Sequence, residues 1–236
     1  LLEPYSDDLK NSGLLLLSGE EFRSLALQCF QNGFQLNTHA IGDRANQQVL
    51  QTYASILGGR NNHRWRIEHA QMIHPDDIDL FNEYSIIPSM QPSHCTSDMK
   101  WLDQRVGADR TDRISKFRTL IDKGLTIAGG SDCPIENGIP IEEIYSVVTR
   151  QDKSGSPSTG WHPEERITQI EALKMFTTWA AYSSFEENRR GRIRPGYLAD
   201  MTVLSKDITT IHPEDILTIS IMSTIKQGEI LFENTP

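Results

Sequence analysis

Short apolar runs in the first half of the chain each end at a polar residue, and a helix-like pattern follows each of them. The runs are residues 34–38 before His39, 65–68 before His69, 86–90 before Gln91, and 125–128, which continue through two glycines to Asp132. Strands that alternate with helices are typical of a parallel sheet built from right-handed βαβ units. The pattern therefore predicts an α/β fold.

Three helices are predicted between or beside these strands. Asp43 is expected to cap the first one, whose apolar face consists of Ala45, Val49, Tyr53 and Leu57. Gly58 should end this helix, because glycine readily adopts the left-handed conformation found there. Further helices are expected over 75–84 and 114–121, where apolar residues also recur at helical spacing.

The spacing of the polar strand ends carries further information. His69 follows His39 by 30 residues, and Asp132 follows His69 by 63. One βαβ step takes roughly 30 residues, so His39, His69, His94 and Asp132 are predicted at the carboxyl ends of successive strands. In a (β/α)8 TIM-type barrel these ends share one rim, and that rim holds the active site.

The last part of the chain has a different pattern. The turn-rich segment 191–196 precedes apolar runs at 201–204 and 219–225, and Gln227-Gly228 is expected to form a hairpin turn into 229–232. We expect residues 1–190 to form a partial (β/α) barrel. Residues 191–236 are expected to supply strands of a small β-sandwich.

His39, His69 and Asp132 together suit a divalent metal ion such as zinc. Zinc lowers the pKa of bound water, and a neighbouring carboxylate can then transfer the proton to a leaving amine. Asp132 is the candidate for this catalytic step, because Gly129-Gly130-Ser131 leaves room beside it. A single histidine at a strand end is more often a hydrogen-bonded structural residue, and that interpretation stays open for each one alone.

Other polar residues have weaker functional interpretations. His94 is expected in a loop, where it either contacts the substrate or only supports the loop. Glu68 should point away from His69 if the strand alternates, which favours a structural role. Cys133 follows Asp132, but no motif or basic neighbour supports a nucleophilic role.

Composition excludes several classes of protein. The 236 residues carry a net charge of -9, which disfavours binding to the phosphate backbone of nucleic acids. No apolar run approaches the roughly 18 residues that a membrane-spanning helix needs. Three widely spaced cysteines indicate free thiols in a reducing compartment, and no signal peptide is recognisable, so a cytoplasmic location is expected.

Five segments resemble the amidohydrolase superfamily, and its family 3 in particular. They are THAIGDRAN at 38–46, RIEHAQ at 66–71, MQPSH at 90–94, GGSDCP at 129–134 and GRIRPGYLADMTVL at 191–204. The resemblance implies a (β/α)8 barrel beside a small β-sandwich, with zinc as the usual metal. His39, His69 and Asp132 match the residues after the fifth, sixth and eighth strands. It also implies hydrolysis of carbon–nitrogen bonds outside ordinary peptides in a small amide substrate.

The chain departs from this family at its start. It contains no His-x-His pair, which the family carries on its first strand, and the fourth-strand metal-bridging residue should precede Leu1. We therefore expect the C-terminal half of such an enzyme. Its exposed strand edges would associate with the missing N-terminal half or with another copy of the chain.

Two other functions stay open at this point. One is a catalytically inactive fragment or binding remnant, which the missing His-x-His pair favours. The other is a metal-free barrel enzyme such as an isomerase or lyase, which leaves the GGSDCP and EHAQ segments unexplained.

Overall fold

The computed structural model describes residues 1–234, which divide into two compact units. The first unit contains residues 1–90 and 97–127, and the second contains residues 91–96 and those from 128 onward. Each unit is described below by itself.

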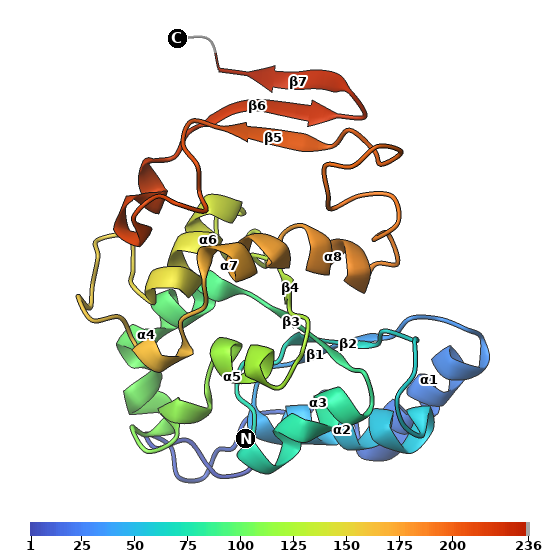
Figure 1. Ribbon diagram of the computed structural model, residues 1–236. Coiled ribbons are helices and arrows are strands. Elements are labelled where there is room, and N and C mark those ends of the chain that lie inside the picture. Colours follow the sequence, from blue (N-terminus) through green and yellow to red (C-terminus); the bar gives the residue numbers. More distant parts are fainter. Residues whose placement is uncertain (235–236) are drawn as a thin grey trace. The chain divides into compact units, whose positions relative to one another are not determined.

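Three parallel strands form the centre of the first unit. They are β1 (Asn37–Ala40), β2 (Arg66–His69) and β3 (Ile87–Met90), which pair in that order. Helix α2 (Asp43–Leu57) connects β1 to β2, and the short helices η1 (Pro75–Asp77) and α3 (Ile78–Glu83) connect β2 to β3. Figure 1 shows α2 and α3 along one side of β1 and β2. The predicted βαβ units are therefore confirmed.

Helix α2 begins one residue earlier in the chain than its predicted cap implies. Gly42 is the N-cap, and Asp43 is the first helical residue, with its Oδ1 accepting a hydrogen bond from the backbone N–H of Leu2 (2.8 Å). The prediction that Asp43 caps this helix is therefore wrong. Gly58 ends the helix with a φ of 70°, as expected for a left-handed cap.

The buried face of α2 also differs in part from the predicted one. Val49 and Tyr53 are buried as expected, but Ala45 and Leu57 are only half-buried. Asn46 and Leu50 are fully buried instead. Burial of an asparagine is uncommon, and it bears on the candidate site described below.

The remaining elements of the first unit extend its core. Helix α1 (Gly19–Gln31) packs on α2, and a capping box between Ser18 and Glu21 begins it. The long helix α4 (Pro92–Val106) belongs to this unit from residue 97 onward, and it is followed by η2 (Thr111–Arg113) and α5 (Phe117–Asp122). Trp65, Phe81 and Phe117 are fully buried in this unit.

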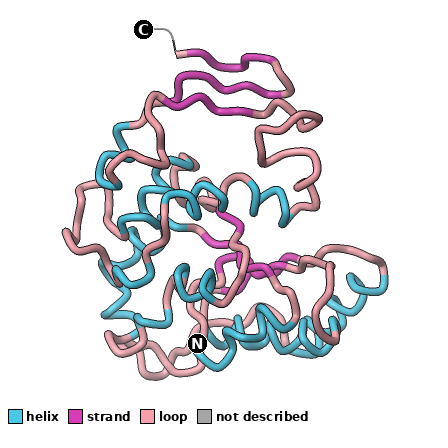
Figure 2. The backbone as a smooth tube through the Cα atoms, viewed as in Figure 1, coloured by secondary structure: helices cyan, strands magenta, loops and turns pink. Residues whose placement is uncertain are grey.

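The second unit combines short helices with an antiparallel sheet. Its first elements are β4 (Ala128–Gly129), shorter than the predicted run, then α6 (Pro140–Thr149), η3 (Pro163–Glu165), α7 (Gln169–Met175) and α8 (Thr178–Ser183). The strands β5 (Met201–Leu204), β6 (Ile221–Lys226) and β7 (Glu229–Glu233) form a three-stranded sheet, drawn in magenta near the C-terminus in Figure 2, and η4 (Pro213–Thr218) precedes β6.

The predicted hairpin between β6 and β7 is confirmed. Gln227 and Gly228 both have positive φ, at 53° and 85°, which suits a tight two-residue turn.

The architecture is thus α/β, with a parallel sheet and a small antiparallel sheet, as predicted. A domain boundary between residues 190 and 191 stays a prediction. In the part of the chain that the structure describes, no helix is long and apolar enough to cross a membrane.

Candidate metal centre

Two histidines lie side by side at the carboxyl ends of β1 and β2. The centroids of the His39 and His69 rings are 4.5 Å apart, with an angle of 78° between the ring planes. Ala40 of β1 pairs with His69 of β2 in the parallel register, so the two strand ends are level. His39 is exposed, whereas His69 is only 7% exposed. The pair therefore presents one accessible imidazole and one sheltered imidazole.

The backbone of β2 becomes irregular where the rings of His39 and His69 lie side by side. In a regular strand, successive side chains point to opposite faces of the sheet. His69 and Ala70 have φ values of 75° and 45°, in the left-handed region, and so depart from the regular strand conformation. Such conformations cost of order 1–3 kcal/mol each in non-glycine residues, and surrounding contacts must hold them. Strained residues of this kind are often found at functional sites.

Glu68, which precedes His69, interacts with its own strand. Its Oε1 accepts a hydrogen bond from Nε of Arg66 at 3.0 Å. This ion pair is compatible with the structural role predicted for Glu68.

A cavity of about 1000 Å³ within the first unit has His39 in its wall. Gln71 also lines it and donates a hydrogen bond from Nε2 to Oδ2 of Asp98, at 2.8 Å. The wall further includes Trp101 and four consecutive leucines, residues 14–17. A concave site with apolar walls and a few polar groups is typical of small-molecule binding.

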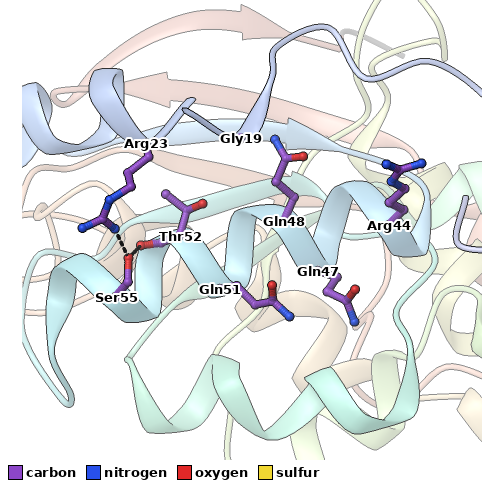
Figure 3. A pocket seen from close by; sticks show the side chains of 8 residues that line it. All are labelled: Gly19, Arg23, Arg44, Gln47, Gln48, Gln51, Thr52 and Ser55. Carbon is purple, nitrogen blue, oxygen red and sulfur yellow. Dashed lines mark hydrogen bonds between the residues drawn. The ribbon is translucent and has the colours of Figure 1, made fainter. Parts of the chain in front are cut away.

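A second, smaller pocket between α1 and α2 has different chemistry. Figure 3 shows the polar side chains that line it, with Arg23 hydrogen-bonded to Ser55. The described residues that line it are Gly19, Arg23, Arg44, Gln47, Gln48, Gln51, Thr52 and Ser55. Because none of these is a histidine, cysteine or carboxylate, the pocket is no metal site.

Asp132 belongs to the second unit and lies on an exposed turn with a φ of 55°. Of the two glycines that precede it, Gly129 is required by close packing. A Cβ on Gly129 would lie 2.9 Å from the Phe176 ring and 3.0 Å from Cβ of Met175. The participation of Asp132 in a shared site with His39 and His69 stays a prediction.

His94 also belongs to the second unit, but it does not lie in a loop as predicted. It is in the first turn of α4 and is 8% exposed. The prediction of a loop failed because Pro92, read as a loop residue, is the first residue of α4. Proline is favoured at this position, where its missing N–H has no helical partner in any case.

Glu143 of α6 anchors the start of α4 and was not predicted from the sequence. Its carboxylate accepts hydrogen bonds from the backbone N–H of Ser93 (2.8 Å) and from the Ser93 hydroxyl (2.6 Å). Burial raises the pKa of Glu143, although these hydrogen bonds act in the opposite direction. An acidic residue within the apolar run of α6 was the available signal.

The pair of imidazoles fits a divalent metal ion. Zinc binds histidine nitrogen at about 2.0–2.1 Å, and two rings on one ion then have centroids roughly 5 Å apart. The observed 4.5 Å between the ring centroids is close to this value. Among residues 1–234, no group of three or more histidine, cysteine, aspartate or glutamate side chains is arranged to hold a metal. His39 and His69 are thus the two predicted ligands that the structure brings together.

Comparison with known proteins decides the family. The model of the Amidohydro_3 amidohydrolase family matches residues 1–232. The chain belongs to the amidohydrolase family. This membership confirms the resemblance seen in the sequence motifs.

Curated relatives of this amidohydrolase are much longer than the chain itself. It is 33% identical to the putative amidohydrolase YtcJ of Bacillus subtilis (strain 168), over 100% of this chain and 44% of that protein. It is 24% identical to the N-substituted formamide deformylase of Arthrobacter pascens, over 94% of this chain and 41% of that protein. The chain therefore spans less than half the length of these relatives.

A solved structure is also similar to this chain over less than half of its own length. An uncharacterized metal-dependent hydrolase from Pyrococcus horikoshii OT3 matches with a TM-score of 0.78 and 25% sequence identity. The match covers 89% of this chain and 42% of that chain. The prediction that this fold corresponds to about half of a metal-dependent hydrolase is confirmed.

Proposed function

We propose that this amidohydrolase chain is the metal-binding part of an enzyme that hydrolyses carbon–nitrogen bonds outside ordinary peptides. The meeting of His39 and His69 at two adjacent strand ends is the observation that supports this proposal. Membership of the amidohydrolase family supports it further. The chain spans less than half of its relatives' length, so the catalytic activity is proposed for the whole protein, which is called the longer protein below.

Each candidate residue has a distinct role in the proposed reaction. His39 and His69 hold a divalent ion, zinc in the first instance. When bound, the ion supplies Lewis acidity that polarises an amide carbonyl and lowers the pKa of water. Asp132 takes the proton from the attacking water and passes it to the leaving amine. His94 contacts the substrate.

The proposed substrate is a small amide with an apolar part. The cavity beside His39 supports this choice, because leucines 14–17 and Trp101 line it together with polar Gln71 and Asp98. A relative of this chain is an N-substituted formamide deformylase, so N-substituted formamides are the substrates to assay first.

A second candidate is a chain that binds metal or another ligand without catalysis. The small number of ligands that come together favours it, because among residues 1–234 no group of three or more potential ligands is arranged to hold a metal. Metal binding without turnover in the longer protein would support this candidate over the enzyme.

Zinc titration of the purified chain tests the metal site directly. We expect His39→Ala and His69→Ala each to weaken zinc binding at least tenfold, measured by competition with a chromogenic chelator. His212→Ala is the matched control, because His212 is an exposed histidine of the second unit. Equal zinc binding by wild type and the double variant His39→Ala/His69→Ala would reject the site.

The role of Asp132 is tested in the longer protein. Asp132→Asn keeps the shape of the side chain but removes its ability to accept a proton. A general base or acid contributes about 10²–10⁴-fold to rate, so kcat for an N-substituted formamide should fall by that factor. Undiminished turnover in this variant would reject the assignment of Asp132.

A further inference from the structure

We propose that Asn46 is a positioning residue that sets the spacing of His39 and His69. This inference rests on the proposed metal function of the two histidines. Asn46 lies in the first part of α2 and its side chain is 0% exposed. It contacts the backbone at the end of β1 and just after the end of β2, and these two strands bear His39 and His69.

The side-chain amide of Asn46 joins the two segments through backbone oxygens. Its Nδ2 lies 3.2 Å from the carbonyl oxygen of Ala40, which directly follows His39. The same nitrogen lies 3.0 Å from the carbonyl oxygen of Met72, three residues after His69. It also lies 3.1 Å from the carbonyl oxygens of Ile41 and Gly42. One amide group thus contacts the chain just beyond each histidine.

Backbone hydrogen bonds connect the same two segments. The N–H of Ala70 donates to the carbonyl oxygen of Ala40 at 3.1 Å, and the N–H of Met72 donates to that of Ile41 at 2.9 Å. Both acceptor carbonyls are also those that Asn46 contacts. Asn46 therefore reinforces the pairing that continues the sheet past its last regular residues.

This reinforcement explains how strained residues persist beside the site. His69 and Ala70 lie in the left-handed region of φ, and such residues are stable only when their neighbours hold them. Asn46 contacts the carbonyl of Met72, just after this irregular stretch, and ties it to the end of β1. Without this link, the ring of His69 would lose a fixed position relative to the ring of His39.

Position 46 requires a side chain that donates hydrogen bonds, because carbonyl oxygens surround it. An asparagine amide carries two N–H groups, and here they face four carbonyl oxygens. Among the described residues, none donates a hydrogen bond to the Oδ1 atom of Asn46. An ionised aspartate has the same shape but only acceptor oxygens, which would repel these carbonyls. Asn46→Asp therefore removes the link with little change in volume.

The test compares Asn46→Asp with a matched variant, Asn61→Asp. Asn61 also donates from Nδ2 to two carbonyl oxygens, those of Gly59 and Tyr84, both at 2.8 Å. Its partners precede β2 and β3, at the ends of the strands opposite to the histidines. The two variants make the same chemical change, but only one of them makes it beside His39 and His69.

Two measurements distinguish positioning from general stability. In metal-free protein with labelled histidines, we expect nuclear Overhauser effects between the His39 and His69 rings in wild type and Asn61→Asp, and their loss in Asn46→Asp. Zinc affinity should fall about 10–100-fold in Asn46→Asp, the usual effect of losing a group that orients a ligand. It should stay within twofold of wild type in Asn61→Asp.

Asn46→Ser is a second, milder variant in case Asn46→Asp does not fold, because the serine hydroxyl retains one hydrogen-bond donor. It should show weakened ring contacts and an intermediate loss of zinc affinity. Wild-type ring contacts and wild-type zinc affinity in either folded Asn46 variant would overturn the proposal. If wild type itself binds no zinc, the proposed function fails, and the ring contacts alone still decide the role of Asn46.

Discussion

Replacing Glu143 would show how strongly a buried carboxylate holds the start of α4, the helix that carries His94. Glu143 is 2% exposed, and its two oxygens accept hydrogen bonds from the N–H and hydroxyl of Ser93. The first N–H groups of a helix have no partner within the helix. A carboxylate at this end satisfies one of them and interacts favourably with the helix dipole.

The expected loss of stability follows from these two hydrogen bonds. Glu143→Ala leaves a buried N–H and a buried hydroxyl without their acceptor, and each such loss costs about 1–3 kcal/mol. The free energy of unfolding should therefore fall by about 2–6 kcal/mol. Glu143→Gln keeps an oxygen for the Ser93 N–H, and its amide can donate to the Ser93 hydroxyl. We expect it to cost less than about 1.5 kcal/mol at neutral pH.

The pH dependence gives the sharper test. Because burial raises the pKa of Glu143, the folded chain holds this proton more tightly than the unfolded chain does. The stability that this carboxyl contributes is fully present below its unfolded pKa of about 4.3 and is lost as pH rises through the raised folded value. Glutamine does not titrate. The stability of Glu143→Gln relative to wild type should therefore increase with pH.

Urea unfolding followed by circular dichroism at several pH values between 4 and 8 measures this difference. Glu142→Gln is the control for net charge, because Glu142 lies on the same helix and pairs with Lys153 at 2.6 Å instead of Ser93. A stability difference between Glu143→Gln and wild type that stays constant or decreases with rising pH would refute the reasoning.

Two further substitutions test the packing of each unit. Tyr53→Phe removes a buried hydroxyl that lies 2.6 Å from Oγ1 of Thr38, and should lower the free energy of unfolding by about 1 kcal/mol in a urea titration; an unchanged value would mean that this hydrogen bond contributes nothing. Gly129→Ala places a Cβ 2.9 Å from the Phe176 ring and should cost about 1–3 kcal/mol, with recovery when Phe176→Leu is added. Failure of that second change to restore stability would argue against the contact as the cause.

Much of the first unit was predictable because its strands and helices have strong local signals. The runs before His39 and His69 are short and apolar, and glycine pairs or prolines mark the helix limits. The predicted βαβ order, the terminal hairpin at Gln227-Gly228 and the amidohydrolase resemblance were all confirmed. These features depend on neighbours along the chain.

The errors arose where distant contacts override local preference. His94 was expected in a loop, yet Glu143 supplies the hydrogen-bond partner that lets α4 begin at Pro92. Glu143 lies 50 residues from Ser93 along the chain, so no local pattern could reveal the pair. Asn46 was likewise not predicted, because its four acceptors become neighbours only when the ends of β1 and β2 pair.

The amino-acid sequence alone determined the family, the order of strands and helices, and the identity of the candidate ligands. Alternating apolar and polar positions, turn residues and short motifs carry that information, and all of them act over a few residues. Only the tertiary structure decided that the ring of His69 lies beside that of His39, because this depends on the left-handed backbone at His69 and Ala70. Contacts between residues far apart in sequence hold that backbone, and they exist only once the chain has folded.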